Sequence, residues 1–217
     1  MGYIPEANVE WAMVNRLKAV LEAPEPTDFN VTRAFSAFCT ILLWTKQRAW
    51  VGGNNPQLLD PADLAANAVR RDLAAGSITD LPWSLSQIVP ARMESLDGRW
   101  REGMAVNEAF FARPADAFFR WVRDVIAHGD GRKIRPISKI GRDGKVAYIG
   151  GVTLRSRADF LEPTQPQREL NLDLFKDDMV RLGSELADRF CVSMSQDPGY
   201  IHLDIATQSV RELGGDK

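Results

Sequence analysis

Apolar residues recur at helical spacing in the first third of the chain, in segments that Pro and Gly residues separate. Residues 5–22 place them on one side of a helix, and residues 28–50 place them nearly all round. An apolar surface on all sides is typical of a buried helix, so the second segment is expected at the centre of a helical bundle. A third helix is predicted for 60–75, because Asp60 and Pro61 supply an N-cap and a first-turn proline.

A further amphipathic helix is predicted to start at Pro114 and to end at His128. Its apolar residues recur at the three- and four-residue steps of one buried face: Phe118, Trp121, Val122, Val125 and Ile126. Arg120 and Asp124 fall between them. The turn-forming run 129–131 stops the helix, so His128 is expected in its last turn.

Beyond this helix the sequence period changes to that of a β-strand. Residues 137–140 and 146–154 are expected to form a small hairpin around the turn 141–144. The pair Gly150 and Gly151 weakens the second strand and indicates a bulge or the close approach of another backbone. A final long helix is expected after the hairpin.

That closing helix is predicted to run from about Asp173 to Met194, after an extended linker marked by Pro163 and Pro166. Its inner positions follow the helical period: Phe175, Met179, Leu182, Leu186 and Phe190. The hairpin is therefore expected as an insertion between two helices.

The whole chain, residues 1–217, is expected to fold as one mainly α domain, a helical bundle with a small β-hairpin insertion. Residues 1–103 would supply the N-terminal helices and a cover segment that is helical at most over 90–96. Residues 104–196 would supply the helix ending at His128, the hairpin and the closing helix, and 197–217 would form a tail. A chain of 217 residues, 45% of them hydrophobic, is long enough to bury such a core.

Charge is unevenly distributed along the chain. The formal net charge of the whole chain is −2, which is unlike a non-specific nucleic-acid binder with a uniformly basic surface. Residues 120–145, however, hold eight Lys or Arg against three Asp, a local charge of +5. Cations are thus concentrated around and after His128. Taken alone, such a run is also typical of a solvated hairpin.

Few residues suggest metal or redox chemistry. Cys39 and Cys191 lie in apolar helical surroundings, which favours two buried thiols over a disulfide. Two Cys and two His predict no metal site, and no cofactor is expected. The longest apolar run, 37–44, is too short to span a bilayer, and the amino terminus lacks a secretory pattern. A soluble, cytoplasmic protein without a membrane partner is expected.

Three polar residues near the end of the 114–128 helix are candidates for chemistry. Asp124 and His128 are one turn apart, so the carboxylate can reach an imidazole nitrogen and set its tautomer. Arg123 and His128 are five residues apart and therefore roughly 140° apart on a regular helix. Two routes could bring them to one reacting group: unwinding of the helix at His128, or a two-fold dimer with a shared cleft.

The run Arg123-Asp124-Val125-Ile126-Ala127-His128 carries a resemblance to a known family. It is similar to the signature of the HEPN superfamily (higher eukaryotes and prokaryotes nucleotide-binding): Arg, then Asn, Asp or His, three further residues, then His. An aromatic amphipathic helix precedes this run, and Gly-Asp-Gly-Arg and Ile-Arg-Pro follow it. The segment 174–191 looks like the closing helix of that group. The resemblance covers about residues 104–194.

The resemblance implies a metal-independent endoribonuclease that acts on RNA through 2′-OH attack. His128 would serve as general base or acid, because an unperturbed imidazole titrates near neutrality. Arg123 would stabilise the charge that develops on the phosphorane, and Asp124 would orient His128. A homodimer would let one His accept a proton while the other donates one. The cations that follow the helix would bind flanking phosphates: Arg132, Lys133 and Arg135.

The resemblance also implies a biological setting. Such enzymes act as toxins or phage-defence effectors, with an antitoxin or other regulator as partner. Toxins of the group that pair with nucleotidyltransferase antitoxins carry a Tyr two residues after the His, where this chain has Asp130. Silencing by nucleotidylation at that position is therefore not expected.

Other interpretations of the same residues stay open. A His at a helix C-terminus commonly only complements the helix dipole, and Arg123 would then pair with Asp177 or Asp178 of the closing helix. The alternative function is a non-catalytic HEPN-like module that binds a nucleotide or RNA or serves in dimerisation. A helical interaction protein without a nucleic-acid role is the third interpretation.

Overall fold

The computed structural model describes residues 4, 6–24, 30–54, 60–82, 93–95, 111–128, 133–140 and 146–197. The longer helices of these residues are α1 (Val9–Glu22), α2 (Asn30–Asn54), α3 (Pro61–Ala75), α5 (Ala115–His128) and α6 (Lys176–Ser195). The strands are β1 (Met93–Ser95), β2 (Ile134–Ile140), β3 (Val146–Arg157) and β4 (Glu169–Phe175). Short 3-10 helices are η1 (Glu6–Asn8), η3 (Ile78–Asp80) and η6 (Asp159–Leu161). Helices hold most of the described residues, so the predicted mainly α class is confirmed.

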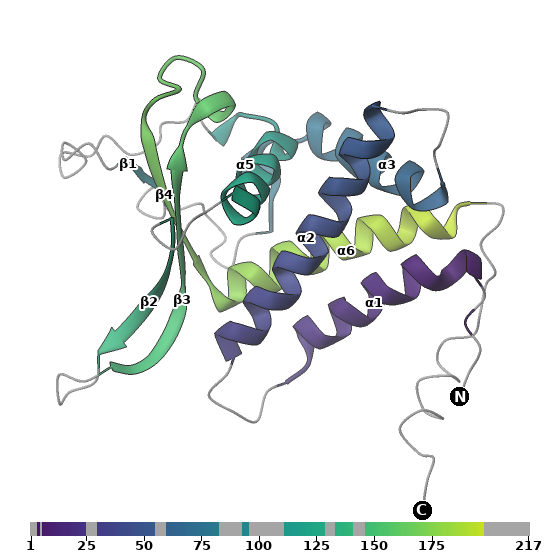
Figure 1. Ribbon diagram of the computed structural model, residues 1–217, viewed down its shortest axis with the longest axis horizontal. Helices are drawn as coiled ribbons and strands as arrows, with labels where there is room; N and C mark the ends of the chain where they lie inside the picture. Colours follow the sequence, from purple (N-terminus) through teal and green to yellow (C-terminus); the bar gives the residue numbers. More distant parts are fainter. Residues whose placement is uncertain are drawn as a thin grey trace, which may run out of the picture.

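Helix α2 lies at the centre of the helical layer, with α1, α3, α5 and α6 packed against it (Figure 1). The side chains of Phe38, Ile41 and Leu42 are completely buried. The central position predicted for this nearly all-apolar helix is therefore confirmed. The reason is that its hydrophobic surface needs partners on several sides to leave water.

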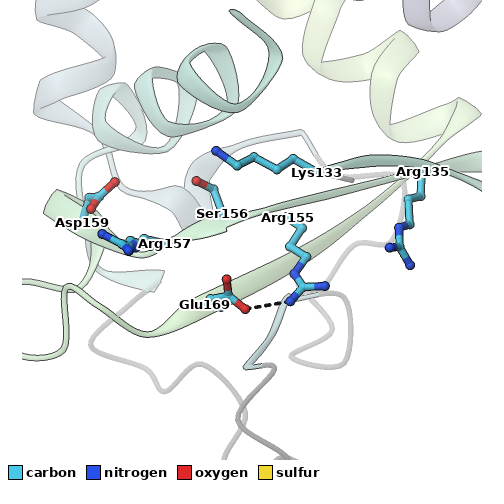
Figure 2. A pocket seen from close by; sticks show the side chains of 7 residues that line it. All are labelled: Lys133, Arg135, Arg155, Ser156, Arg157, Asp159 and Glu169. Carbon is cyan, nitrogen blue, oxygen red and sulfur yellow. Dashed lines mark hydrogen bonds and ion pairs between the residues drawn. The ribbon is translucent and has the colours of Figure 1, made fainter. Parts of the chain in front are cut away.

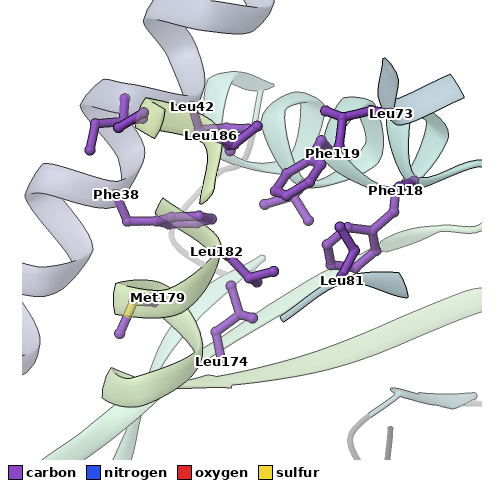
Figure 3. Close-up of a cluster of buried hydrophobic side chains, with 14 of the residues drawn as sticks. Phe38, Leu42, Leu73, Leu81, Phe118, Phe119, Leu174, Met179, Leu182 and Leu186 are labelled. Carbon is purple, nitrogen blue, oxygen red and sulfur yellow. The ribbon is translucent and has the colours of Figure 1, made fainter. Parts of the chain in front are cut away.

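The hydrophobic core joins the helices to the sheet. Figure 3 shows side chains from α2, α5 and α6 meeting one from β4: Phe38, Phe118, Phe119, Met179, Leu182 and Leu174. Each of these is fully buried. Helix α5 contributes the apolar face predicted from its sequence, with Trp121, Val122 and Val125 also buried. That face positions the helix that ends at His128.

The predicted start of α3 is confirmed in detail. The Asp60 carboxylate accepts a hydrogen bond from the backbone N–H of Asp63 (2.8 Å), and the Asp63 carboxylate accepts one from the N–H of Asp60 (3.4 Å). Pro61 occupies the first turn. Such a reciprocal cap satisfies two N–H groups that the helix itself leaves unpaired.

The strands form one antiparallel sheet with the order β1-β4-β3-β2, at one side of the helices (Figure 1). The predicted hairpin is present as β2 and β3. The register passes from Ile137 opposite Gly151 to Ser138 opposite Ile149, which leaves Gly150 as the extra residue of a bulge. A Cβ at Gly151 would lie 2.4 Å from the carbonyl oxygen of Leu174 in β4. Both meanings of the glycine pair, a bulge and a close backbone approach, are confirmed.

Two strands of this sheet were not predicted. Residues 169–175 form β4 and pair with β3, whereas the sequence suggested a linker and a helix starting at Asp173; α6 begins at Lys176. The alternating burial of Leu170, Leu172 and Leu174 explains the strand, because every second side chain faces the core. The sheet is therefore larger than a hairpin insertion.

The other unpredicted strand is β1, within the cover segment for which at most a helix over 90–96 was expected. Its three residues pair with β4, Glu94 opposite Asn171. Backbone partners so distant in sequence outweigh the local helical tendency of such a short stretch. Most of the predicted tail, 198–217, lies outside the described residues.

The environments of the two cysteines differ slightly. Both are free thiols; Cys191 is buried and Cys39 is partly buried. Within the described segments, no helix is long and apolar enough to cross a membrane.

Candidate functional site

Helix α5 holds Arg123 on the side that faces α2. The residue two turns earlier on the same side, Asp116, forms an ion pair with Lys46 of α2, whose side chain is only 7% exposed. Burial lowers the pKa of Lys46 and is the largest effect on it. The Asp116 carboxylate raises this pKa, and the positive charge of Arg123 lowers it further. The Arg123 side chain is itself 15% exposed. Two cations are thus kept close together at the contact between α2 and α5.

Asp124 fixes the guanidinium of Arg123. An Arg123 Nη2 lies 3.0 Å from a carboxylate oxygen of Asp124, and Nε of Arg120 lies 4.0 Å from the other oxygen. Within the described segments, the buried Nε of Arg123 has no hydrogen-bond partner. If Arg123 were only structural, an ion pair with Asp177 or Asp178 was expected. Arg123 pairs instead with Asp124, its neighbour in sequence.

His128 is the last residue of α5 and is exposed. The helix stays regular up to this residue, so unwinding does not bring His128 and Arg123 together within one chain. Over the part of the chain that can be described, no hydrogen bond or ion pair joins His128 to Asp124, whose carboxylate pairs with arginines instead. Of the two routes to a shared cleft, the two-fold dimer is the one compatible with this helix.

The face of α5 that carries His128 is directed toward the end of β3. Trp121, two turns before His128 on the same face, donates a hydrogen bond of 2.7 Å from its indole Nε1 to the carbonyl oxygen of Arg157. The Arg120 guanidinium lies 4.5 Å from the ring centre of Phe160 in η6. Arg123 therefore lies on the side of α5 that faces α2, whereas Trp121 and Arg120 contact the end of β3 and η6.

A polar pocket of about 530 Å³ lies where β2 starts, β3 ends and β4 begins. Figure 2 shows its lining side chains: Lys133, Arg135, Arg155, Ser156, Arg157, Asp159 and Glu169. We call it the strand-end pocket. Four cations face two carboxylates there. Arg155 forms an ion pair with Glu169 at 2.9 Å (Figure 2).

The strand-end pocket contains part of the predicted phosphate-binding group. Lys133 and Arg135 line it, whereas Arg132 lies outside the described residues. Sequence reasoning missed Arg155 and Arg157, because the second hairpin strand was expected to end at Leu154. The signal was present, since basic residues at alternate positions continue a strand pattern beyond that point.

The pocket lies within reach of His128 along the chain. Lys133 follows His128 by five positions, so their Cα atoms are at most about 18 Å apart even if the chain between them is fully extended.

A second hollow of similar volume is lined by apolar and polar side chains of α2 and α3, among them Trp44, Arg48 and Asp63. Its arginine is already engaged. Arg48 pairs with Glu10, Asp60 and Asp63 and lies 5.4 Å from the ring centre of Trp44. This hollow therefore does not offer a free cation to an anionic ligand.

Among the residues that the structure describes, no group of three or more His, Cys, Asp or Glu is arranged to hold a metal ion. No family model, curated protein or solved structure matches the chain. The geometry of α5 and of the strand-end pocket is therefore what bears on function.

Proposed function

We propose that the protein is a metal-independent endoribonuclease of HEPN type that acts as a homodimer. The observation that supports this most directly is the placement of the Arg123–His128 motif. The helix that carries it is hydrogen-bonded through Trp121 to Arg157 at the end of β3, and that strand end forms part of a pocket lined by Lys133, Arg135, Arg155 and Arg157. An imidazole and a guanidinium next to phosphate-binding cations suit cleavage of an RNA backbone.

The reaction would use the RNA's own 2′-OH as nucleophile. One imidazole removes the proton of the 2′-OH, the oxygen forms a bond to phosphorus, and the bond to the 5′-oxygen breaks. The imidazole of the other protomer, which starts as the imidazolium cation, gives a proton to that leaving oxygen. The products are a 2′,3′-cyclic phosphate and a 5′-OH. The Arg123 guanidinium would donate hydrogen bonds to the phosphorane oxygens, where negative charge accumulates.

The dimer is needed because Arg123 and His128 point about 140° apart on a regular helix. His128 is exposed at the helix end, so a partner's His128 can approach the Arg123 side of this chain. In this proposal Asp124 positions Arg123 through their 3.0 Å ion pair. Lys133 and Arg135 would bind flanking phosphates, and affinity would fall with salt as counterions are released. In the cell, a toxin or phage-defence role with a restraining regulator is part of the same proposal.

A second candidate function is a non-catalytic module that binds RNA or a nucleotide. It is favoured by the engagement of Arg123, which is mostly buried, paired with Asp124 and close to the buried Lys46. A guanidinium so placed has a structural role whether or not it meets a phosphate. This module would bind RNA through the strand-end pocket without turnover.

The test is cleavage of a 5′-labelled single-stranded RNA by the purified chain and by His128→Ala, Arg123→Ala and Arg123→Lys. The matched control is Arg71→Ala, which removes an exposed arginine of α3 far from the motif in sequence. We expect the motif variants to lose cleavage by at least a hundredfold, while light scattering reports unchanged dimers and circular dichroism reports unchanged helix content.

Analysis of the product ends completes the experiment. A 2′,3′-cyclic phosphate and a 5′-OH are expected. Undiminished cleavage by either alanine variant would end the proposal, and RNA binding by the wild-type chain without any turnover would establish the module instead.

A further inference from the structure

The strand-end pocket has features that the cleavage chemistry does not use. Arg155, Ser156 and Arg157 lie at the end of β3, Glu169 at the start of β4, and Asp159 in η6. None of these residues belongs to the Arg123–His128 motif. The question is which ligand this combination of charges and shape would select.

The charge of the pocket matches a doubly charged anion. Lys133, Arg135, Arg155 and Arg157 contribute four positive charges, and Asp159 and Glu169 contribute two negative ones. The resulting +2 balances a phosphate monoester, which carries about −1.5 to −2 at neutral pH. A phosphodiester within an RNA strand carries one negative charge and would neutralise only half of the pocket's net charge of +2.

The cations of the pocket are unequally available. The Arg155 guanidinium donates a hydrogen bond to the carboxylate of Glu169, the first residue of β4 (Figure 2). For Lys133, Arg135 and Arg157, no ion pair with another described residue occurs. Among the described residues, three cations of the pocket are therefore not committed to an ion pair. Ser156 adds a hydroxyl that can donate one more hydrogen bond.

The backbone beneath the pocket is held in place by hydrogen bonds from several directions. The N–H of Arg155 donates to the carbonyl oxygen of Lys133 (2.7 Å), and that of Ala158 donates to the carbonyl oxygen of Arg168 (2.7 Å). The Arg157 carbonyl accepts the bond from Trp121. Side chains that start from a fixed backbone lose less freedom when a ligand binds, so the site is partly preorganised.

Size and lining indicate how much of a ligand would be recognised. About 530 Å³ is enough for a mononucleotide. The described lining is charged or polar throughout and offers no aromatic ring on which a base could stack. Recognition would therefore depend on the phosphate, with little preference among bases.

We infer that the strand-end pocket binds a terminal phosphate monoester, as carried by a free nucleotide or by the phosphorylated end of an RNA. The site shares Lys133 and Arg135 with the proposed function but requires neither Arg123 nor His128. It would stand even if the protein cleaved nothing. If the protein does cleave RNA, the pocket would anchor a phosphorylated end and set the distance from that end to the cut.

The test measures binding to the full chain by calorimetry and fluorescence anisotropy. The probes are uridine 5′-monophosphate, uridine, and a short 2′-O-methyl oligonucleotide with a 5′-phosphate, a 3′-phosphate or hydroxyl groups at both ends. The 2′-O-methyl group prevents cleavage, so binding is read by itself. We expect a phosphorylated probe to bind at least tenfold more tightly than its hydroxyl counterpart, as loss of a charge-assisted hydrogen bond would predict.

Variants assign the effect to the pocket. Arg157→Gln and Lys133→Gln should each reduce that preference by about tenfold, whereas Arg71→Gln on α3 should leave it unchanged. Thermal melting of each variant checks folding. Preference for the nucleotide alone would identify a free nucleotide as the ligand, and preference for a phosphorylated oligonucleotide would identify an RNA end. Equal affinity for phosphorylated and hydroxyl probes, or a full preference in folded Arg157→Gln, would overturn the inference.

Discussion

The indole Nε1 of Trp121 donates a 2.7 Å hydrogen bond to the backbone carbonyl of Arg157. This bond joins the helix that carries Arg123 and His128 to the strand end that carries the pocket. Trp121 is 1% exposed, so its indole N–H would be unpaired in a dry environment without this acceptor. The relative position of the motif and the pocket depends in part on this contact.

Replacing Trp121 by Phe should therefore be costly. Phe keeps an aromatic ring but lacks the indole N–H and the second ring, so the carbonyl of Arg157 loses its donor and a small cavity is left. We expect a loss of about 1–3 kcal/mol in the free energy of unfolding. Urea denaturation measures it. Trp44→Phe is the control, because the buried Nε1 of Trp44 has no hydrogen-bond partner among the residues that the structure describes, and its removal should cost less. An equal loss in both variants would contradict the role assigned to the Trp121 bond.

Removing Asp116 from its ion pair with Lys46 should cost more stability than removing Lys46. Asp116→Ala leaves a buried ammonium without its carboxylate, for which about 3–5 kcal/mol is expected. Lys46→Met removes the charge and keeps the volume, and Asp116 is partly exposed, so its loss should be smaller. Chemical denaturation of both variants at pH 7 compares them. A larger loss for Lys46→Met would contradict the desolvation account.

Lys46 should also make stability depend on pH. Burial lowers the pKa of Lys46 in the folded chain below its ordinary value of 10.5, so the unfolded chain holds this proton more tightly. Stability from this group therefore rises as pH rises from the folded-state pKa toward 10.5. The stability of wild type relative to Lys46→Met should increase between pH 8 and pH 10, as measured by urea denaturation. A constant difference over that range would show that the pKa is not lowered.

Gly151→Ala should disrupt the sheet. The added Cβ would lie 2.4 Å from the carbonyl oxygen of Leu174, a backbone atom that cannot move without shifting β4. We expect a loss of about 1–3 kcal/mol in thermal or chemical unfolding. The control is Gly76→Ala, where the nearest atom is 3.6 Å away and φ is −97°. Comparable losses at Gly76 and Gly151 would contradict the close approach of β3 and β4.

Both thiols should react slowly in the folded chain. Burial raises the pKa of Cys39 and of Cys191 to about 12, so very little thiolate exists at pH 8. Labelling with iodoacetamide, followed by mass spectrometry, should modify both cysteines rapidly in urea and neither of them rapidly in buffer. Fast labelling of Cys39 in buffer would show that its surroundings open in solution.

Features that depend on near neighbours could be predicted from the sequence. The apolar stripe of α5, its end at His128 and the N-cap at Asp60 followed by Pro61 involve residues within a few positions of each other. The bulge and the close backbone approach at Gly150 and Gly151 could also be predicted, since glycine in a strand interior often marks one or the other. Helix periodicity and capping are local properties of the chain, and local physics is visible in the order of residues.

Features that join distant segments could not. The alternation of Leu170, Leu172 and Leu174 forms a strand because β3 is there to pair with it. The pocket forms because the start of β2, the end of β3 and the start of β4 come together at one place. The neighbourhood of Arg123 and Lys46 spans two helices far apart in sequence. Strand pairing and helix packing depend on which distant surfaces exclude water together, and no short window of residues contains that information.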